Sequence, residues 1–183
     1  RKMAALEGGK AGVASSSGQS AILMAVMAFC QAGDHVLAAS QLYGGTVTLF
    51  TKTMGKMGIQ VDFVDQTASL DVLRQALKPN TKLIHGESLA NPALRVLDFD
   101  KFAALAKEAG LPFMVDNTFP TPYLCQPIQH GADIIVHSTT KFVDGHATSV
   151  GGVVIDAGTF DWTNGKFPEF TEPDASYHGV VYT

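Results

Sequence analysis

The chain has 183 residues, of which 46% are hydrophobic and 16% charged, so it can bury one sizeable core and is expected to form one domain or little more. Its 13 basic and 17 acidic side chains leave a formal charge of −4. No basic stripe is present, which argues against nucleic acid as a partner. The apolar run Ala21–Cys30 is half as long as a membrane-spanning helix, which needs about 20 residues. We therefore expect a buried helix there and no membrane contact.

Cysteine usage indicates the cellular compartment, and the chain ends indicate whether the sequence is part of a longer protein. Cys30 and Cys125 are too few for a disulfide framework, and no charged leader with a cleavage site opens the sequence, so a cytoplasmic location is predicted. Residues 1–7 are typical of the last turns of a helix that Gly8 and Gly9 stop, and residues 177–183 end without a polar tail. We expect a fragment of a longer protein.

Apolar runs alternate with helical patterns along the chain. In chain order, the expected elements are a helix at Ser20–Gln31, a strand at His35–Ala39, a helix at Thr46–Met57, a strand at Gln60–Val64, a helix at Leu70–Leu77, a strand at Lys82–His85, a helix at Phe99–Ala109, a strand at Pro112–Val115, a short helix at Pro127–His130 and strands at Asp133–His137 and Gly152–Ile155. Strands joined by helical crossovers predict an α/β fold with a mostly parallel sheet sandwiched by helices. From Phe160 onward, turn formers and aromatic residues predict a long ordered loop.

In an open parallel sheet, ligands bind beyond the carboxyl ends of the strands, so the residues directly after each apolar run are the most informative about function. Polar or small residues occupy that position in four segments: Ser15–Ser20, Gly86–Pro92, Asp116–Thr118 and Ser138–Lys141.

The first of these segments is a turn of small residues. Gly18 and Gln19 stand at the start of an apolar helix, where free backbone N–H groups and the positive end of the helix dipole favour an anion such as phosphate. Plain helix capping explains the same residue types. The segment is not a P-loop, because no Gly-Lys-Ser/Thr follows.

The last segment combines hydroxyl groups with an amine. Ser138 and Thr140 could complete a phosphate site, and Lys141 beside them could reach an aldehyde carbon. A desolvated lysine near other polar groups has a lowered pKa and becomes a nucleophile that forms Schiff bases. The alternative is an ordinary exposed loop lysine.

Two further side chains suit a heterocyclic ligand. Asp116 ends the apolar run Leu111–Val115, where a carboxylate can hydrogen-bond a pyridine nitrogen and keep it protonated; an Asx turn is the alternative. Tyr43 precedes Gly44 and Gly45, so its ring can stack on a planar group while its hydroxyl faces a substrate, although such a tyrosine is otherwise a packing residue.

In this order, the turn at Ser17–Ser20, Tyr43, the segment Glu87–Pro92, Asp116 and Ser138–Lys141 resemble the Cys/Met-metabolism family of fold-type I enzymes, which depend on pyridoxal 5′-phosphate (PLP). The resemblance covers residues 1–183. It implies that the whole chain is the large PLP-binding domain of these enzymes, which are aminotransferase-like, with an N-terminal arm and a C-terminal domain absent. It also implies a homo-oligomer, a dimer of dimers or homotetramer, whose subunits share sites.

The resemblance implies roles for individual residues. Lys141 would hold PLP as a Schiff base, Asp116 would pair with the pyridine nitrogen, and the catalytic residues would be Lys141 and Tyr43, which stacks on the ring. The remaining positions would hold the phosphate (Gly18, Gln19, Ser138, Thr140), lie near the phenolic oxygen (Asn91) or support the ring and substrate side (Glu87, Ser88, Thr118). At Gln19, lyases of the family often carry methionine, so the turn fits a lyase less well.

The stretch Phe160–Gly179 resembles the O-acetylhomoserine sulfhydrylase branch of the family. That branch carries out a γ-replacement, in which sulfide or a thiol replaces the acetate of O-acetylhomoserine and yields homocysteine or methionine. The alternatives within the family are methionine γ-lyase and cystathionine γ-synthase or γ-lyase.

Other classes of function fit less well. A nicotinamide-dependent dehydrogenase would need a Gly-x-Gly-x-x-Gly motif, which is absent, and a non-catalytic interaction fragment would leave Lys141 and Asp116 unexplained. The six histidines, among them His137 and His146 beside the lysine loop, form no pair at ligand spacing with a cysteine or carboxylate. Structural roles for them, and no metal, are predicted.

Overall fold

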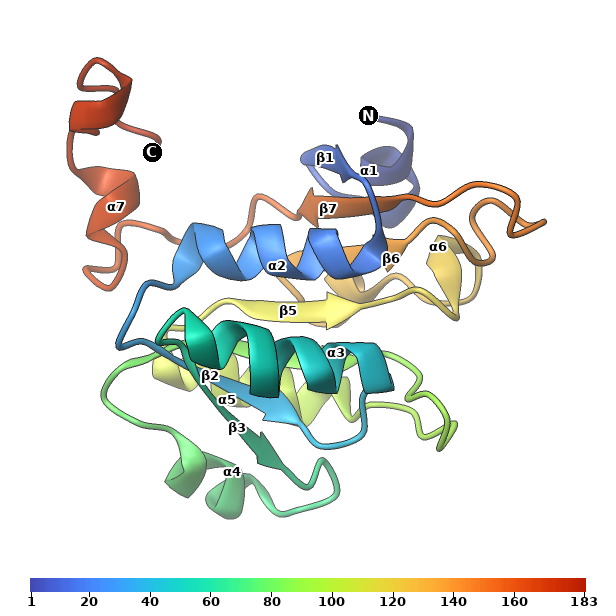
Figure 1. Ribbon diagram of the computed structural model, residues 1–183. Helices are drawn as coiled ribbons and strands as arrows, with labels where there is room; N and C mark the ends of the chain where they lie inside the picture. Colours follow the sequence, from blue (N-terminus) through green and yellow to red (C-terminus); the bar gives the residue numbers. More distant parts are fainter.

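The computed structural model describes residues 1–183 as one seven-stranded sheet with helices on both faces (Figure 1). The strand order is β1-β7-β6-β5-β4-β2-β3. Only β7 runs against the other strands, since it pairs antiparallel with both β1 and β6 while every other pair is parallel. The strands are β1 (Ala11–Ser15), β2 (His35–Ala39), β3 (Gln60–Val64), β4 (Thr81–Glu87), β5 (Phe113–Asp116), β6 (Ile134–Ser138) and β7 (Gly152–Asp156).

The helices form the outer layers. On one face, α2 (Gly18–Phe29) packs on β6 and β7 and contacts α3 (Gly44–Thr48), which continues as the π-helix η1 (Leu49–Met54). In the other layer, α4 (Leu70–Ala76) packs on α5 (Phe99–Ala109), and α5 contacts the 3₁₀-helix η2 (Pro127–His130). The short elements are α1 (Lys2–Glu7), α6 (Thr121–Leu124), α7 (Pro168–Thr171) and η3 (Ala175–Tyr177).

The predicted mostly parallel α/β architecture is confirmed. Two predicted strands, His35–Ala39 and Gln60–Val64, and the helix Phe99–Ala109 have the predicted bounds, and the other predicted strands differ by one or two residues. Strand β2 is buried at all five positions, as expected for a strand covered on both faces. The helix predicted at Ser20–Gln31 begins at Gly18 instead, because the Ser17 side chain caps it by accepting a hydrogen bond from the Ser20 N–H.

Strand β1 has no counterpart among the predicted elements. Four of its five residues are exposed, and Ala-Gly-Val-Ala-Ser carries little apolar patterning. It becomes a strand through its pairing with β7, from Ala11 opposite Asp156 to Ser15 opposite Gly152. Tertiary contact, rather than local propensity, therefore decides this edge of the sheet.

The stretch after Phe160 is only partly the loop that its composition predicts, because it contains α7 and η3. Aromatic stacking ties it to the core: the Trp162 ring lies 5.1 Å from that of Phe29 in α2 and 4.7 Å from that of Phe170. The helix predicted at Thr46–Met57 is likewise interrupted by the π-helical turns of η1.

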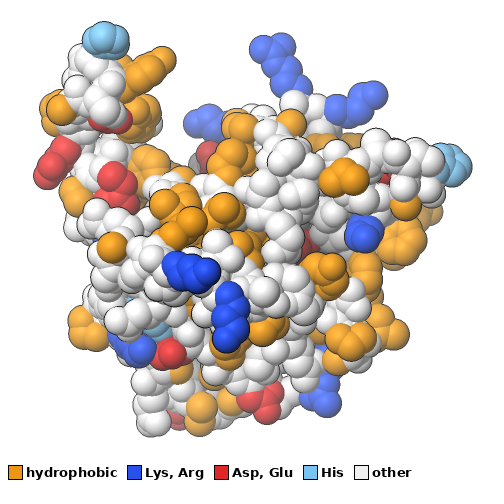
Figure 2. Space-filling model, viewed as in Figure 1, with side chains coloured by type: hydrophobic (Ala, Val, Ile, Leu, Met, Phe, Trp, Pro, Cys, Tyr) orange, Lys and Arg blue, Asp and Glu red, His pale blue; other side chains and the backbone are white.

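The distribution of basic side chains on the surface agrees with the absence of a basic stripe in the sequence. On the face shown in Figure 2, Lys and Arg side chains are scattered among apolar and neutral ones without a continuous basic patch. None of the helices combines the length and the apolar character needed to cross a bilayer.

Two glycines bring the first turn of α2 against the carboxyl end of β6. A Cβ atom on Gly18 would lie 2.5 Å from Ser138 Cβ, and one on Gly152 in β7 would lie 2.1 Å from the Ser17 carbonyl oxygen. Neither position has room for a larger residue. The helix terminus therefore sits directly beside the strand ends, where the polar segments predicted from the sequence meet.

We predict that Gly152→Ala lowers the free energy of unfolding by about 1–3 kcal/mol, because the added methyl group must push the Ser17 backbone away. Gly55→Ala is the matched control. Gly55 has helical dihedral angles and open space around it, so alanine there should be neutral or stabilising by about 0.5–1 kcal/mol. Urea unfolding of both variants measures the difference, and equal stability would contradict the close contact.

Candidate functional site

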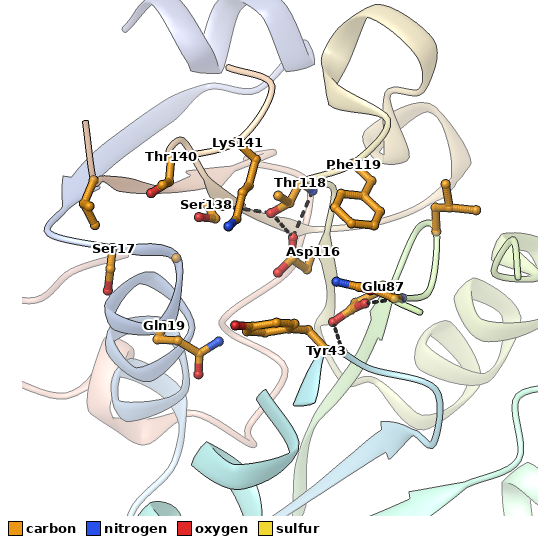
Figure 3. A pocket seen from close by; sticks show the side chains of 14 residues that line it. Ser17, Gln19, Tyr43, Glu87, Asp116, Thr118, Phe119, Ser138, Thr140 and Lys141 are labelled. Atoms are coloured by element: carbon orange, nitrogen blue, oxygen red, sulfur yellow. Dashed lines mark hydrogen bonds between the residues drawn. The ribbon is translucent and has the colours of Figure 1, made fainter. Parts of the chain in front are cut away.

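A cavity of about 320 Å³ lies at the carboxyl ends of the parallel strands (Figure 3). It is lined by ten of the eleven residues singled out from the sequence: Gly18, Gln19, Tyr43, Glu87, Asn91, Asp116, Thr118, Ser138, Thr140 and Lys141. They come from five separate segments of the chain. The predicted convergence of the strand-end segments is therefore observed.

The amino end of α2 forms one wall. Ser17 and Ser20 cap the helix reciprocally, with the Ser20 hydroxyl oxygen accepting from the Ser17 N–H at 2.8 Å. Capping and anion binding are thus compatible here, because the N–H groups of Gly18 and Gln19 in the first turn have no intrahelical acceptor. The Ser138 side chain lies against Gly18 and adds a hydroxyl group to this wall. An anion at this corner would meet backbone donors and the positive end of the helix dipole.

Gln19 links this wall to the next. Its Nε2 donates to the hydroxyl oxygen of Thr46 at 3.1 Å, and Thr46 is fully buried in α3. The backbone N–H of Thr46 in turn donates to the Tyr43 carbonyl. The side chain of Gln19 therefore ties the turn at α2 to the segment that carries Tyr43.

Asp116 stands at the end of β5 in a shell of donors. Its Oδ1 accepts from the Thr118 N–H at 2.9 Å and from the Thr118 hydroxyl at 2.5 Å, while Oδ2 has no partner within the chain. Burial raises the pKa of the Asp116 carboxyl group, and the two Thr118 hydrogen bonds and the charge of His137 oppose that rise. Asp116 thus forms the Asx turn that was the alternative interpretation and still has one carboxyl oxygen, Oδ2, without a partner in the chain.

Glu87 is the register partner of Asp116 on β4 and is almost completely buried. Its Oε1 accepts from the Tyr43 N–H at 2.6 Å, and its Oε2 accepts from the Asn91 N–H at 3.3 Å. Burial, and secondly the nearby charge of Asp116, raise the pKa of Glu87 to about 8. At neutral pH its carboxyl group is therefore mostly neutral, and it connects the Tyr43 and Asn91 segments.

Lys141 and Tyr43 complete the cavity. The Lys141 ammonium group has no hydrogen-bond or ion-pair partner, and Figure 3 shows the side chain directed toward Asp116. Tyr43 is half-exposed and presents its ring to the same space. An anion cradle, a free amine, a carboxylate and an aromatic plane together suit a planar, anionic heterocycle that carries an electrophilic carbon.

Ser88 is the exception among the predicted residues, because it does not line the cavity. It is buried beneath the floor, where its hydroxyl group lies 2.8 Å from Asn117 Oδ1 and 3.1 Å from the Asp116 carbonyl oxygen. In this arrangement Ser88 holds the end of β5, and its predicted role in supporting the substrate side stays a prediction.

Four lining residues were not singled out from the sequence: Ser17, Leu89, Phe119 and Val150. The only available signal was position, since Phe119 directly follows Asp116–Thr118 and Leu89 lies within the Glu87–Pro92 segment. Nothing in the sequence marks Val150.

Among residues 1–183, no group of three or more His, Cys, Asp or Glu side chains is arranged to hold a metal ion.

Comparison with known proteins adds an independent line of evidence. Residues 1–172 match the family model described as Cys/Met metabolism PLP-dependent enzyme. A crystal structure assigned to an O-acetylhomoserine (thiol)-lyase from Campylobacter jejuni, with N′-pyridoxyl-lysine-5′-monophosphate in its chain, is similar at a TM-score of 0.95 and 37% identity. The similarity covers 99% of this chain and 45% of that one.

Curated relatives are closer in sequence. An O-acetyl-L-homoserine sulfhydrylase of Leptospira meyeri is 50% identical over 182 residues, which is 100% of this chain and 41% of the relative. A homocysteine synthase of Schizosaccharomyces pombe is 47% identical over 186 residues, covering 100% of this chain and 43% of the relative. The chain thus spans about two fifths of the length of the curated relatives that it matches.

We predict that Glu87→Gln changes how stability depends on pH. With a pKa near 8 in the folded state against 4.5 in the unfolded chain, Glu87 keeps its proton on folding, so the ligand-free protein loses stability as pH rises from about 4.5 to 8. Glutamine keeps the acceptor for the Tyr43 N–H but does not titrate, so that loss should shrink by about 1 kcal/mol or more.

Urea unfolding of the ligand-free, full-length protein at pH 5.5 and pH 8 measures this effect. Glu172→Gln, which alters an exposed carboxylate, is the control. Parallel pH profiles for Glu87→Gln and the parent would show that Glu87 ionises normally in the fold.

Proposed function

Because this chain belongs to the Cys/Met metabolism PLP-dependent enzymes, we propose that residues 1–183 form the domain that holds PLP for a γ-replacement reaction. Its sheet and helices have the fold-type I architecture expected from the sequence. The observation that carries the proposal is the convergence of Lys141, Asp116 and Tyr43 beside the anion cradle of α2.

The donor set of the cavity fits the cofactor. The phosphate would lie at the first turn of α2, where Gly18 leaves no room for a side chain and Ser138 and Thr140 supply hydroxyl groups. The free Oδ2 of Asp116 suits a protonated ring nitrogen, and the unpaired amine of Lys141 suits the aldehyde carbon. Tyr43 would stack on the ring, with Asn91 near the phenolic oxygen.

Each residue of the cavity would then have a separate role in the reaction. PLP, when bound, supplies an electron sink for negative charge on the substrate carbon. The carboxylate of Asp116 would keep the ring nitrogen protonated, and the amine of Lys141, once free, would move protons between neighbouring substrate carbons. Tyr43 would exclude water from one side of the ring and face the substrate with its hydroxyl group.

The reaction branch rests on similarity rather than on geometry. The Leptospira meyeri relative is named an O-acetyl-L-homoserine sulfhydrylase and the Schizosaccharomyces pombe relative a homocysteine synthase. We infer the same transferase reaction for the protein of which this chain is part: sulfide or a thiol replaces the acetate of O-acetylhomoserine and gives homocysteine or methionine. A γ-lyase or a cystathionine γ-synthase would use the same cavity and differ in the second nucleophile.

We further propose a homo-oligomer, a homotetramer built as a dimer of dimers, in a cytoplasmic setting. Exposed apolar side chains cluster in the segments that leave the carboxyl ends of β4, β5 and β6: Leu94, Val96, Tyr123, Leu124 and Phe142. Exposed apolar side chains of this size are common at subunit interfaces. Both cysteines are free, which supports a reducing compartment.

We predict that Lys141→Ala abolishes turnover in the full-length enzyme but leaves measurable PLP affinity, because the phosphate cradle and Tyr43 do not depend on the covalent bond. Borohydride reduction of the parent followed by peptide mapping should find the phosphopyridoxyl group on Lys141. The variant should carry none. An unchanged rate in Lys141→Ala, or label on another lysine, would reject the assignment.

The branch predicts a substrate preference. Full-length enzyme should convert O-acetylhomoserine and sulfide to homocysteine much faster than it converts methionine to an α-keto acid and ammonia, because acetate is a better leaving group than a thiolate. Product formation from both substrates at equal concentration is the measurement. Dominant α-keto acid from methionine would place the protein among the γ-lyases.

A further inference from the structure

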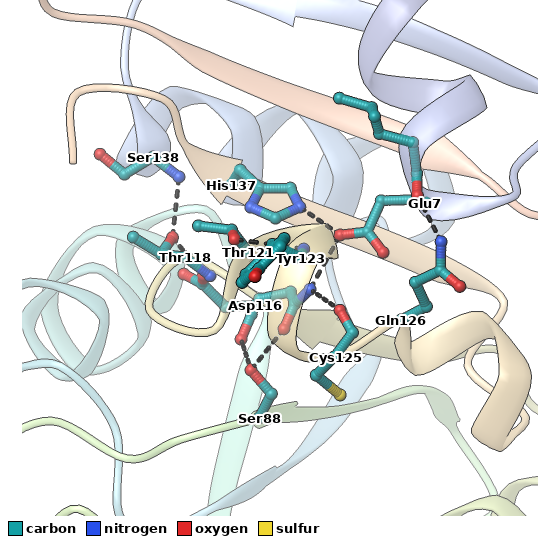
Figure 4. Close-up of polar contacts among 12 residues, drawn as sticks. Glu7, Ser88, Asp116, Thr118, Thr121, Tyr123, Cys125, Gln126, His137 and Ser138 are labelled. Carbon is teal, nitrogen blue, oxygen red and sulfur yellow. Dashed lines mark hydrogen bonds and ion pairs between the residues drawn. The ribbon is translucent and has the colours of Figure 1, made fainter. Parts of the chain in front are cut away.

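The ends of β5 and β6 present two different sets of side chains (Figure 4). Asp116, Thr118 and Ser138 line the cavity. The residues that alternate with them, Asn117 and His137, are fully buried and contact the helix α1 on the side away from the cavity. Because side chains alternate along a strand, whatever fixes Asn117 and His137 also fixes their cavity-facing neighbours.

The contact on the α1 side is Glu7. This carboxyl group is completely buried, accepts a hydrogen bond from Asn117 Nδ2 at 2.8 Å through Oε1, and has the same oxygen 2.5 Å from His137 Nε2. Glu7 Oε2 and His137 Nδ1 have no partner. Nothing in the proposed chemistry of the cavity uses this pair.

The hydrogen bonds around Glu7 and His137 indicate which of the two groups donates in their contact. Glu7 Oε1 already accepts from an amide, so His137 Nε2–H is the donor in the shorter contact. A buried carboxylate without a cation is strongly disfavoured, whereas an imidazolium beside it compensates the charge.

A continuous chain of contacts leads from this pair to Asp116. The Ser88 hydroxyl group bridges Asn117 Oδ1 and the Asp116 carbonyl oxygen, at 2.8 and 3.1 Å. From His137, the peptide N–H of Ser138 donates to the Thr118 hydroxyl oxygen at 2.8 Å, and that hydroxyl group donates to Asp116 Oδ1. Both routes end on the residue that would face the cofactor ring.

We propose that Glu7 and His137 form a buried ion pair that positions Asp116 and keeps its carboxyl group ionised beneath the ring nitrogen of the cofactor. The inference rests on the cofactor placement proposed above. In support, the charge of His137 lowers the pKa of Asp116 and so opposes the rise that burial causes. Glu7 and His137 are positioning residues, since neither lines the cavity.

The other titratable groups near the pair do not replace it. Asp116 of β5 lies within range of the charge of His137, although the two side chains point to opposite faces of the sheet. Cys125, whose carbonyl oxygen accepts from Asn117 Nδ2, lies near Glu7. Burial, and secondly the charge of Glu7, raise the pKa of the Cys125 thiol, so it stays neutral. On the side away from the cavity, the charge of His137 is the one that lowers the pKa of Asp116, whereas Lys141 approaches Asp116 from within the cavity.

The test uses full-length protein loaded with PLP labelled with ¹⁵N at the pyridine nitrogen, whose chemical shift reports protonation directly. Glu7→Gln keeps an acceptor for Asn117 but removes the charge, and His137→Gln removes the cation. His35→Gln is the matched control, because His35 is also fully buried and pairs with Asp62 at 3.4 Å, but at the opposite end of the sheet. Asp116→Asn gives the ¹⁵N chemical shift expected when the carboxylate beneath the ring nitrogen is lost completely.

In both Glu7→Gln and His137→Gln, the pH at which the ring nitrogen loses its proton should fall by about one unit or more, toward that of Asp116→Asn. His35→Gln should match the parent. Parent-like titration in both test variants would overturn the inference and leave the proposed function standing. An unprotonated ring nitrogen in the parent would instead reject the role proposed for Asp116 itself.

A second measurement needs no variant and so does not depend on whether the substitutions fold. Neutron diffraction from the full-length, cofactor-loaded protein should locate hydrogen or deuterium on both ring nitrogens of His137 and none on Glu7. A proton on Glu7 with a neutral His137 would overturn the ion pair.

Discussion

The close approach of the first turn of α2 to the ends of β6 and β7 is the constraint on which the rest of the site depends. Gly18 against Ser138 and Gly152 against the Ser17 carbonyl leave no space for a side chain at either contact. Because of this packing, the free N–H groups of a helix terminus lie beside strand-end hydroxyl groups and Lys141. The anion-binding helix terminus, the amine and the carboxylate can then contact one small ligand together.

Electrostatics sets a second condition, because two carboxyl groups, Asp116 and Glu87, share the floor of the cavity as register partners. Both lose hydration, and the charge of Asp116 further disfavours ionisation of Glu87. Asp116 has the Thr118 hydroxyl group and the charge of His137 in its favour, whereas Glu87 has only weak compensation from two backbone donors. The environment therefore distinguishes the two groups: the charge of Asp116 is better compensated, whereas the carboxyl group of Glu87 is mostly neutral at pH 7.

Much of the site could be predicted because function in parallel sheets gathers at strand ends, and strand ends are visible in the sequence. Asp116 directly follows an apolar run, and Lys141 lies five residues after Val136, the last residue of another, so their position needed no structure, although the roles assigned to them remain predictions. Phe119 and Val150 were missed, since they owe their place in the cavity to the path of a loop. Glu7 was missed because its partner, His137, is 130 residues away along the chain and no local pattern links the two.

The sequence by itself determined the local elements and their class: a strand such as His35–Ala39 is apolar throughout, and Phe99–Ala109 has a helical pattern between Asp98, which caps it, and Gly110. Only the tertiary structure decided the edge strand β1, the π-helical turns of η1, the withdrawal of Ser88 from the cavity and the pairing of Glu7 with His137. The physical reason is range. Hydrophobic periodicity and capping act within a few residues, whereas edge pairing, side-chain orientation at a strand end and the pairing of buried charges depend on which distant segments the fold brings together.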